Sequence, residues 1–201
     1  MTWNELENGA LGLMFSNVSG STPVTTADSS VAEYVLNMPD AAMFAFADLS
    51  SVCPFMKTVT VSPAANTLHL KEVCPDFIRL AESELYTTDS DGTREPFTDY
   101  ILFTDGNLYL KSIPENPLTL SFVCYPAVLT KDTPGETVID YPVKALHAAM
   151  YYMAHRLYLE DDVSIATQYI NMYYALKEEL KAEYAARPAG FDEYVNKAGW
   201  L

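Results

Sequence analysis

The three histidines are the first candidates for chemistry in this sequence, because imidazole binds metals and transfers protons near neutral pH. His147 and His155 lie eight residues apart in a stretch with helical periodicity, which separates them by roughly 12 Å along a helix axis. His69 lies in a segment with strand periodicity, and the sequence contains no HExxH motif and no Cys/His cluster. The histidines are therefore predicted to be structural residues that bind no metal.

The cysteines are the second candidates, because thiolates bind metals and form disulfides. Cys53, Cys74 and Cys124 are odd in number, widely spaced and never arranged as CxxC. Such spacing indicates neither a disulfide framework nor a zinc site. We expect three buried free thiols, and we predict no metal site and no cofactor.

The stretch TDSDGTREPFTDY begins like a calcium-binding loop, with Asp89, Asp91 and Gly92. Counted from Asp89, however, the sixth position is Arg94 where glycine is needed, and the twelfth is Tyr100 where glutamate is needed. Asp and Gly here predict a polar turn between two strands.

Motifs for nucleophilic or nucleotide-dependent catalysis do not occur either: the sequence has no GxSxG, P-loop or GxGxxG. We predict no catalytic residue and no enzymatic activity. Because catalytic triads assemble from residues distant in sequence, a small α+β hydrolase or ligand-binding protein stays an alternative.

Tyrosines gather around an acidic turn in YYMAHRLYLEDDVSIATQYINMYYALKEEL, residues 151–180. Eight of the 14 tyrosines lie between Tyr141 and Tyr184, and adjacent ones such as Tyr173 and Tyr174 point in different directions around a helix. Tyrosine buries a large apolar body, keeps a polar hydroxyl and is enriched where proteins meet. A contact between subunits and packing against the chain's own sheet are equal alternatives.

Acidic residues dominate the charge of the chain. Twelve basic and 27 acidic residues give a formal net charge of −15, and no run of Lys or Arg offers a phosphate-binding face. Tight binding to nucleic acid is therefore not expected, although an acidic wall lets DNA slide past without binding. The candidates for facing DNA or a basic partner are Glu160, Asp161, Asp162, Glu178, Glu179 and Glu183. The alternative is a solvated helix face.

Four helices and a central β region are predicted to position these residues. The helices span about 3–14, 30–50, 141–159 and 162–185, and residues 55–125 change to strand periodicity. The fold class is α+β and mainly helical: two N-terminal helices, a small antiparallel sheet, a long C-terminal helical hairpin and an extended tail. We expect one domain over residues 1–186 and a tail over residues 187–201.

Local signals mark several boundaries of these elements. Thr2 and Glu5 form a capping box, Asp161 or Asp162 caps the fourth helix, and Pro39 is expected to break or kink the second helix. Asp105-Gly106 predicts a type I′ hairpin turn. In the last strand, Leu118, Leu120, Phe122 and Cys124 share one face. The inward stripe of the fourth helix is predicted to be Ile165, Tyr169, Met172, Leu176, Leu180 and Tyr184.

The N-terminal stretch MTWNELENGALGLMF has no basic head and no apolar run as long as a signal peptide or membrane span requires. It predicts a protein made in the cytosol that does not bind membranes.

The second half of the sequence, LTLSFVCYPAVLTKDTPGETVIDYPVKALHAAMYYMAHRLYLEDDVSIATQYINMYYALKEELKA, resembles the head-to-tail adaptor (connector) proteins of tailed bacteriophages. In that family a strand ends near Tyr-x-x-Pro, an acidic loop leads to a Tyr-Pro-x-x-x-x-Ala-Leu helix, and an acidic turn precedes a Tyr-x-x-x-Leu helix. The matching positions are Tyr125, Pro126, Leu129, Thr130, 139–146, 160–162 and 173–180. The segments TWNELENGAL and VAEYVLNMPDAAMFAFADLS resemble the family's first two helices.

The resemblance implies a structural virion protein, made in the cytoplasm of the bacterial host and located in the neck. Identical subunits, commonly twelve, would form a ring that joins the portal to the tail and extends the DNA channel without binding DNA specifically. The expected partners are further copies, the portal protein and tail or neck proteins. Another neck or tail-completion protein is the alternative within this class. The residues expected at the portal or subunit interface are Tyr173, Tyr174, Phe191, Tyr194 and Trp200.

Overall fold

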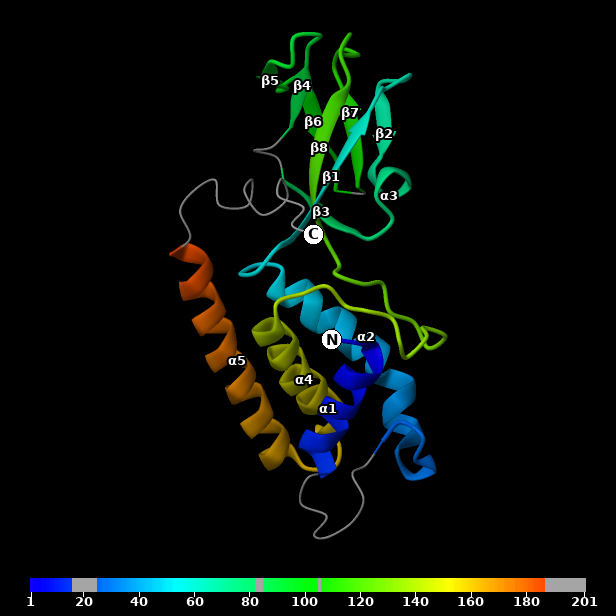
Figure 1. Ribbon diagram of the computed structural model, residues 1–201, viewed down its shortest axis with the longest axis vertical. Coiled ribbons are helices and arrows are strands. Elements are labelled where there is room, and N and C mark those ends of the chain that lie inside the picture. The colour runs from blue at the N-terminus through cyan, green and yellow to red at the C-terminus, as the bar shows by residue number, and fades with distance from the viewer. Residues whose placement is uncertain (16–24, 82–84, 105, 187–201) are drawn as a thin grey trace, which may run out of the picture. The chain divides into compact units, whose positions relative to one another are not determined.

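The computed structural model describes residues 1–15, 25–81, 85–104 and 106–186 (Figure 1). It confirms the α+β class, with helices and two small antiparallel sheets. The chain divides into two compact units. The helical unit comprises Met1–Ala45, Ser51–Cys53 and Thr130–Leu201, and the β unit comprises Phe46–Ser50 and Pro54–Leu129.

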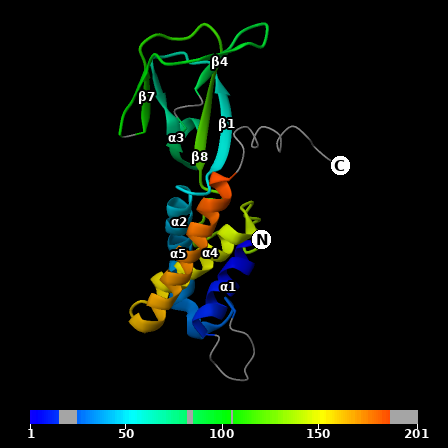
Figure 2. The same ribbon diagram turned by 90° about the vertical axis from the view of Figure 1, so that its left-hand side faces the viewer.

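The long helices are α1 (Trp3–Phe15), α2 (Ala32–Leu49), α4 (Val143–Tyr158) and α5 (Val163–Ala185), and a 3-10 turn (Ser29–Val31) precedes α2. Within the helical unit α4 packs against both α1 and α5 (Figures 1 and 2). Gly9 permits a close approach of α1 to α4, because a Cβ there would lie 2.5 Å from Cε of Met150.

The predicted capping box begins α1. The amide of Thr2 donates to Oε2 of Glu5 over 2.8 Å, and the amide of Glu5 donates to Oγ1 of Thr2 over 3.3 Å. The predicted break in the second helix is wrong, since α2 continues through Pro39. Proline removes only one intrahelical donor, and the buried Met38, Ala41 and Ala42 hold the helix on both sides of it.

The described part of the β unit contains two antiparallel sheets where a single sheet is predicted. The larger has the order β1-β8-β4-β5, with β3 also paired to β8, and the smaller has the order β2-β7-β6. The elements are β1 (Phe55–Val61), β2 (Thr67–His69), α3 (Leu70–Val73), β3 (Phe77–Leu80), β4 (Tyr86–Thr88), β5 (Arg94–Pro96), β6 (Tyr100–Leu102), β7 (Asn107–Leu110) and β8 (Leu118–Cys124).

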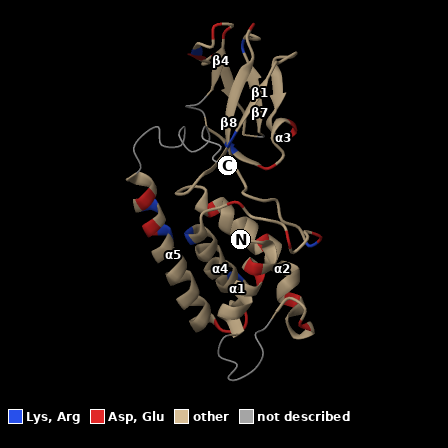
Figure 3. Ribbon diagram, in the orientation of Figure 1, with Lys and Arg blue, Asp and Glu red and all other residues tan. Residues whose placement is uncertain are grey.

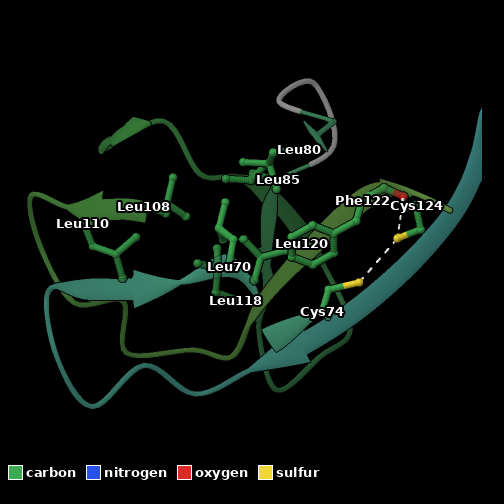
Figure 4. Packing of buried hydrophobic residues seen from close by; sticks show 10 residues of the cluster. All are labelled: Leu70, Cys74, Leu80, Leu85, Leu108, Leu110, Leu118, Leu120, Phe122 and Cys124. Carbon is green, nitrogen blue, oxygen red and sulfur yellow. Dashed lines mark hydrogen bonds between the residues drawn. The ribbon is translucent and has the colours of Figure 1, made fainter. Parts of the chain in front are cut away.

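Strand β8 lies at the centre of the β unit, and all seven of its residues are buried. Its predicted face enters a core that also contains leucines from α3, β7 and the segments around β3 (Figure 4). On its other face the hydroxyls of Thr119 and Thr60 lie 3.1 Å apart, and those of Ser121 and Thr58 lie 3.4 Å apart. Both faces of β8 are therefore buried, and its polar side chains pair with those of β1.

The two predicted turns at the edges of the β unit have different outcomes. The hairpin of β6 and β7 is confirmed, but the predicted type I′ turn centred on Asp105-Gly106 is wrong. The amide of Phe103 donates to the carbonyl of Asn107 over 2.9 Å, so the connection is longer than a two-residue turn, and Gly106, with a φ of 82°, stands at its end. Between β4 and β5, Oδ1 of Asp89 accepts hydrogen bonds from the amides of Asp91 and Thr93, and Gly92 has a φ of 82°. The Asp89 segment is therefore the predicted polar turn.

Glu7 is a buried carboxyl group on α1, with 7% of its surface exposed. Burial raises its pKa from 4.5 to about 7. Between these two values the folded state binds more protons than the unfolded state, so the stability falls as the pH rises.

We predict that Glu7→Gln abolishes this pH dependence. The free energy of unfolding of the natural protein should fall by about 1–3 kcal/mol between pH 4.5 and 7.5 relative to that of Glu7→Gln. Urea unfolding at a series of pH values measures the difference, with the exposed Glu33→Gln on α2 as the control. Parallel pH profiles for the natural protein and Glu7→Gln would contradict the assignment.

Candidate functional site

The tyrosines of α4 and α5 pack largely inside their own helical unit. Tyr173 is fully buried, and its ring lies 5.1 Å from the ring of Tyr152. The hydroxyl of Tyr169 donates to the carbonyl of Leu13, and that of Tyr141 donates to the carbonyl of Cys53. These hydroxyls connect segments that are distant in sequence, which accounts for part of the tyrosine cluster by intramolecular packing.

Helix α5 contacts the rest of the helical unit along a narrow seam. Its fully buried residues, Ala166, Tyr173 and Leu180, recur at intervals of seven. The predicted inward position of Met172 is wrong, since this side chain is 47% exposed and Tyr173 takes its place in the seam. Tyr174, the next residue, is 55% exposed. Much of α5 therefore faces away from the unit that holds it.

The acidic turn before α5 is organised by hydrogen bonds. Oδ1 of Asp162 accepts from the amides of Ser164 and Ile165 over 2.9 and 3.0 Å, so Asp162 is the N-cap. The hydroxyl of Tyr34 donates to Oδ2 of Asp161 over 2.8 Å. Burial and this neighbouring carboxylate raise the pKa of Tyr34 to about 12, which keeps the hydroxyl protonated as a donor. Glu160 is exposed.

The other predicted acidic residues lie near the end of α5 (Figure 3). Lys144 on α4 pairs with Glu179 over 3.2 Å and also with Glu183. Its hydrogen bonds to Glu183 and Glu179 raise the pKa of Lys144. Glu178 pairs with Lys181 over 3.7 Å. Sixteen residues of helix separate Glu178 from Asp162, roughly 24 Å, so the six carboxylates form two groups and not one cluster.

A hollow of about 320 Å³ lies between α2 and α4 in the helical unit. Four of its nine lining residues are acidic, and the guanidinium of Arg156 lies 4.2 Å from the centre of the Phe44 ring. The lining residues are Glu33, Tyr34, Asn37, Asp40, Phe44, Arg156, Leu157, Glu160 and Asp161. Two of the predicted acidic residues thus border a concave acidic surface, which suits a positively charged group of a partner.

The remaining predicted residues have simple placements. Nδ1 of His69 lies 2.7 Å from Oδ1 of Asn107, and Nδ1 of His155 lies 2.9 Å from the carbonyl of Ala166. The three cysteines are buried free thiols, as predicted. The tail residues Phe191, Tyr194 and Trp200, and with them the predicted extended tail, lie outside the described residues.

One cluster was not found by inspection of the sequence. Ligand atoms of Cys74, Asp76 and Cys124 lie within 4.8 Å of one another in the β unit. Cys74 and Cys124 are 50 residues apart, so a search for closely spaced pairs does not connect them. The Cys-x-Asp spacing of Cys74 and Asp76 is the only local feature of the sequence that indicates this cluster.

Comparison with known proteins identifies the class of this molecule. None of the described helices is long and apolar enough to cross a membrane. A search of curated proteins finds no match to the sequence. The profile of the SU10 adaptor protein family matches residues 21–192, which is most of the chain.

The chain belongs to the SU10 adaptor protein family, a family of phage head-to-tail adaptors. Membership confirms the resemblance seen in the sequence. It indicates a structural adaptor of the virion that associates with other phage head and tail proteins.

The N-cap of α5 can be tested by mutation. Asp162→Ala should lower the free energy of unfolding by about 1 kcal/mol, because it leaves the first amides of α5 without their acceptor. Thermal and urea unfolding measure this change. Glu160→Ala, in the same turn and exposed, is the matched control and should change stability by less than about 0.5 kcal/mol. Equal losses in both variants would show that Asp162 does not act as a cap.

Proposed function

We propose that this protein forms a ring of identical subunits, twelve in number, that joins the portal to the tail and extends the DNA channel. The match to the adaptor family over residues 21–192 carries this proposal. The chain acts as a structural component of the neck and not as an enzyme.

The exposed side of α5 supports a role in contact between subunits. Tyr174 offers a large apolar ring with a polar hydroxyl, the combination most often found at energetically important interface positions. Tyr173 lies beneath it, with the two rings 5.4 Å apart, and fixes its position from inside the helical unit. Phe191, Tyr194 and Trp200 add further apolar rings to the same interface or to the contact with the portal.

The negative charge supports passage of DNA without binding. Twelve copies at −15 each carry a formal charge of about −180, which repels phosphates and keeps DNA mobile. Glu160, Asp161 and Asp162 at one end of α5, and Glu178, Glu179 and Glu183 near the other, are the proposed channel-facing groups. Lys144 neutralises part of the second group, so the acidic turn contributes the more strongly negative of the two surfaces.

Particle mass tests this function. The purified protein, mixed with the portal protein of the same phage, should form a complex of twelve adaptor copies on one portal ring. Mass photometry gives the stoichiometry, and class-averaged electron micrographs show whether a layer extends the portal channel. A complex with a tail component and none with the portal would assign the protein to a different neck layer.

Tyr174→Ala should weaken this assembly. Removing an interface tyrosine typically costs 1–2 kcal/mol, so the midpoint concentration for ring formation should rise about tenfold or more. Tyr109→Ala is the matched control, since Tyr109 is an exposed tyrosine of β7 in the other unit. Circular dichroism verifies the fold of both variants. Unchanged assembly of Tyr174→Ala would remove this residue from the interface.

Deletion of residues 188–201 tests the tail. Burial of one aromatic ring contributes about 2–3 kcal/mol before the cost of ordering, so loss of the three rings should weaken portal binding by at least about tenfold. Trp200→Ala in the full chain should account for a large part of this loss. Biolayer interferometry with immobilised portal measures the affinity. Undiminished ring formation and docking by the truncated protein would exclude the tail from the contact.

A further inference from the structure

Two buried thiols and one carboxylate face one another at one end of the β unit. Sγ of Cys74 lies 3.3 Å from Sγ of Cys124 and 3.2 Å from Oδ1 of Asp76. All three groups lie within 4.8 Å of one another. Figure 4 shows the two sulfur atoms directed toward each other at the edge of the core.

The backbone holds these three residues in place. Cys124 ends β8, where it is paired with Phe55 of β1 on one side and Phe77 of β3 on the other. The amide of Tyr125 donates to the carbonyl of Asp76 over 2.9 Å, and the amide of Cys74 donates to the carbonyl of Leu70 over 2.8 Å. The cluster is therefore built by hydrogen bonds among secondary-structure elements and not by an isolated loop.

Lys57 on β1 completes the cluster by pairing with Oδ2 of Asp76. The carboxylate thus presents Oδ1 to the thiols while Lys57 holds the other oxygen. This arrangement matches metal sites in which an outer partner orients a ligating carboxylate. Burial on its own would raise the pKa of Asp76, but the hydrogen bonds from Lys57 and Cys74 lower it and keep the group ionised.

The spacing of the sulfur atoms fits a shared metal ion better than a disulfide. Zinc–sulfur bonds of about 2.3 Å at tetrahedral angles place two sulfurs roughly 3.8 Å apart, whereas a disulfide needs about 2.0 Å. The two sulfur atoms are now 3.3 Å apart. To bind a metal together they must move apart by about half an ångström, whereas to form a disulfide they must move closer by more than 1 Å. A disulfide would also leave Oδ1 of Asp76 without its hydrogen bond from Cys74.

We propose that Cys74, Cys124 and Asp76 form a site for one divalent ion of the zinc class, bound through the two sulfur atoms and Oδ1, with Lys57 as the outer partner. Sulfur and oxygen ligands together suit Zn²⁺. Water occupies the fourth position from the side of Asp76, whose side chain is 18% exposed. The proposal is independent of the proposed function.

The net charge of the cluster does not change when the ion binds. Without metal, two neutral thiols accompany the Lys57–Asp76 ion pair, and the sum is zero. Zn²⁺ displaces one proton from each thiol to solvent, and the two thiolates balance the charge of the ion, so the sum stays zero. No electron is transferred. Burial raises the pKa of both thiols, and the ion must therefore compete with these protons.

The ion would tie the end of β8 to the turn before β3. Because the unfolded chain does not present these ligands together, binding should stabilise the β unit. Three ligands with the fourth position open to water define a weaker site than a closed four-cysteine site. The role assigned to the ion is structural.

Titration of the reduced, chelator-treated full-length protein with Co²⁺ tests the proposal. We expect near-ultraviolet absorption from thiolate-to-cobalt charge transfer that saturates at one ion per chain and disappears when Zn²⁺ displaces Co²⁺. One equivalent of Zn²⁺ should also raise the melting temperature. Absence of both effects in the natural protein would overturn the proposal whatever the variants do.

Three variants locate the site. Cys124→Ser should abolish the absorption, and Asp76→Asn should weaken binding at least about tenfold. Cys53→Ser is the matched control, because Cys53 is a buried free thiol of the other unit, and it should bind one ion as the natural protein does.

Persistence of the signal in folded Cys124→Ser would overturn the proposal. The proposal would also be overturned, in favour of a disulfide, if the protein before reduction had a mass two hydrogen atoms lower than the reduced protein and two fewer titratable thiols.

Discussion

Buried hydroxyl groups need hydrogen-bond partners, because an unpaired one costs about 1–3 kcal/mol, and this constraint shapes both units. In the helical unit, Tyr141 and Tyr169 each donate to a carbonyl of a distant segment. In the β unit, Thr119 on the second face of β8 pairs with Thr60. Among the described residues no buried side-chain nitrogen or oxygen lacks a partner. Burial of apolar side chains alone would allow several arrangements of these segments. The need to pair the buried polar groups selects one of them.

The features that the sequence predicts well depend on neighbouring residues. The Thr2 and Glu5 capping box needs only three residues of separation, and the alternation along β8 follows from the period of a strand. The seam of α5 was harder to predict. Met172 and Tyr173 are both large and adjacent, and hydropathy favours methionine as the inward residue. Tyr173 is buried because Tyr152 on α4 provides an aromatic partner, which periodicity alone does not reveal.

The features that the sequence did not predict depend on long-range pairing. Division of the strands into two sheets depends on which strands pair along their edges. The alternation of apolar and polar residues along each strand is the same for one sheet and for two. The cluster of Cys74, Asp76 and Cys124 forms because β3 and the preceding turn pair with β8 across a separation of 50 residues. The acidic residues also acquire individual partners that the sequence does not reveal: Asp162 caps a helix and Glu179 pairs with Lys144.

A closed ring requires two different complementary surfaces on every subunit, one for each neighbour, because its contacts are heterologous. Successive residues of a helix turn by about 100°, so Met172, Glu179 and Glu183 share one flank of α5, and Tyr174, Glu178 and Lys181 share another. The buried seam of Ala166, Tyr173 and Leu180 lies between these flanks. Each flank combines an exposed apolar side chain with charged groups. A helix held along one narrow seam thus leaves two unlike surfaces available, which supports the proposed ring and explains why tyrosine occurs both inside and outside the same helix.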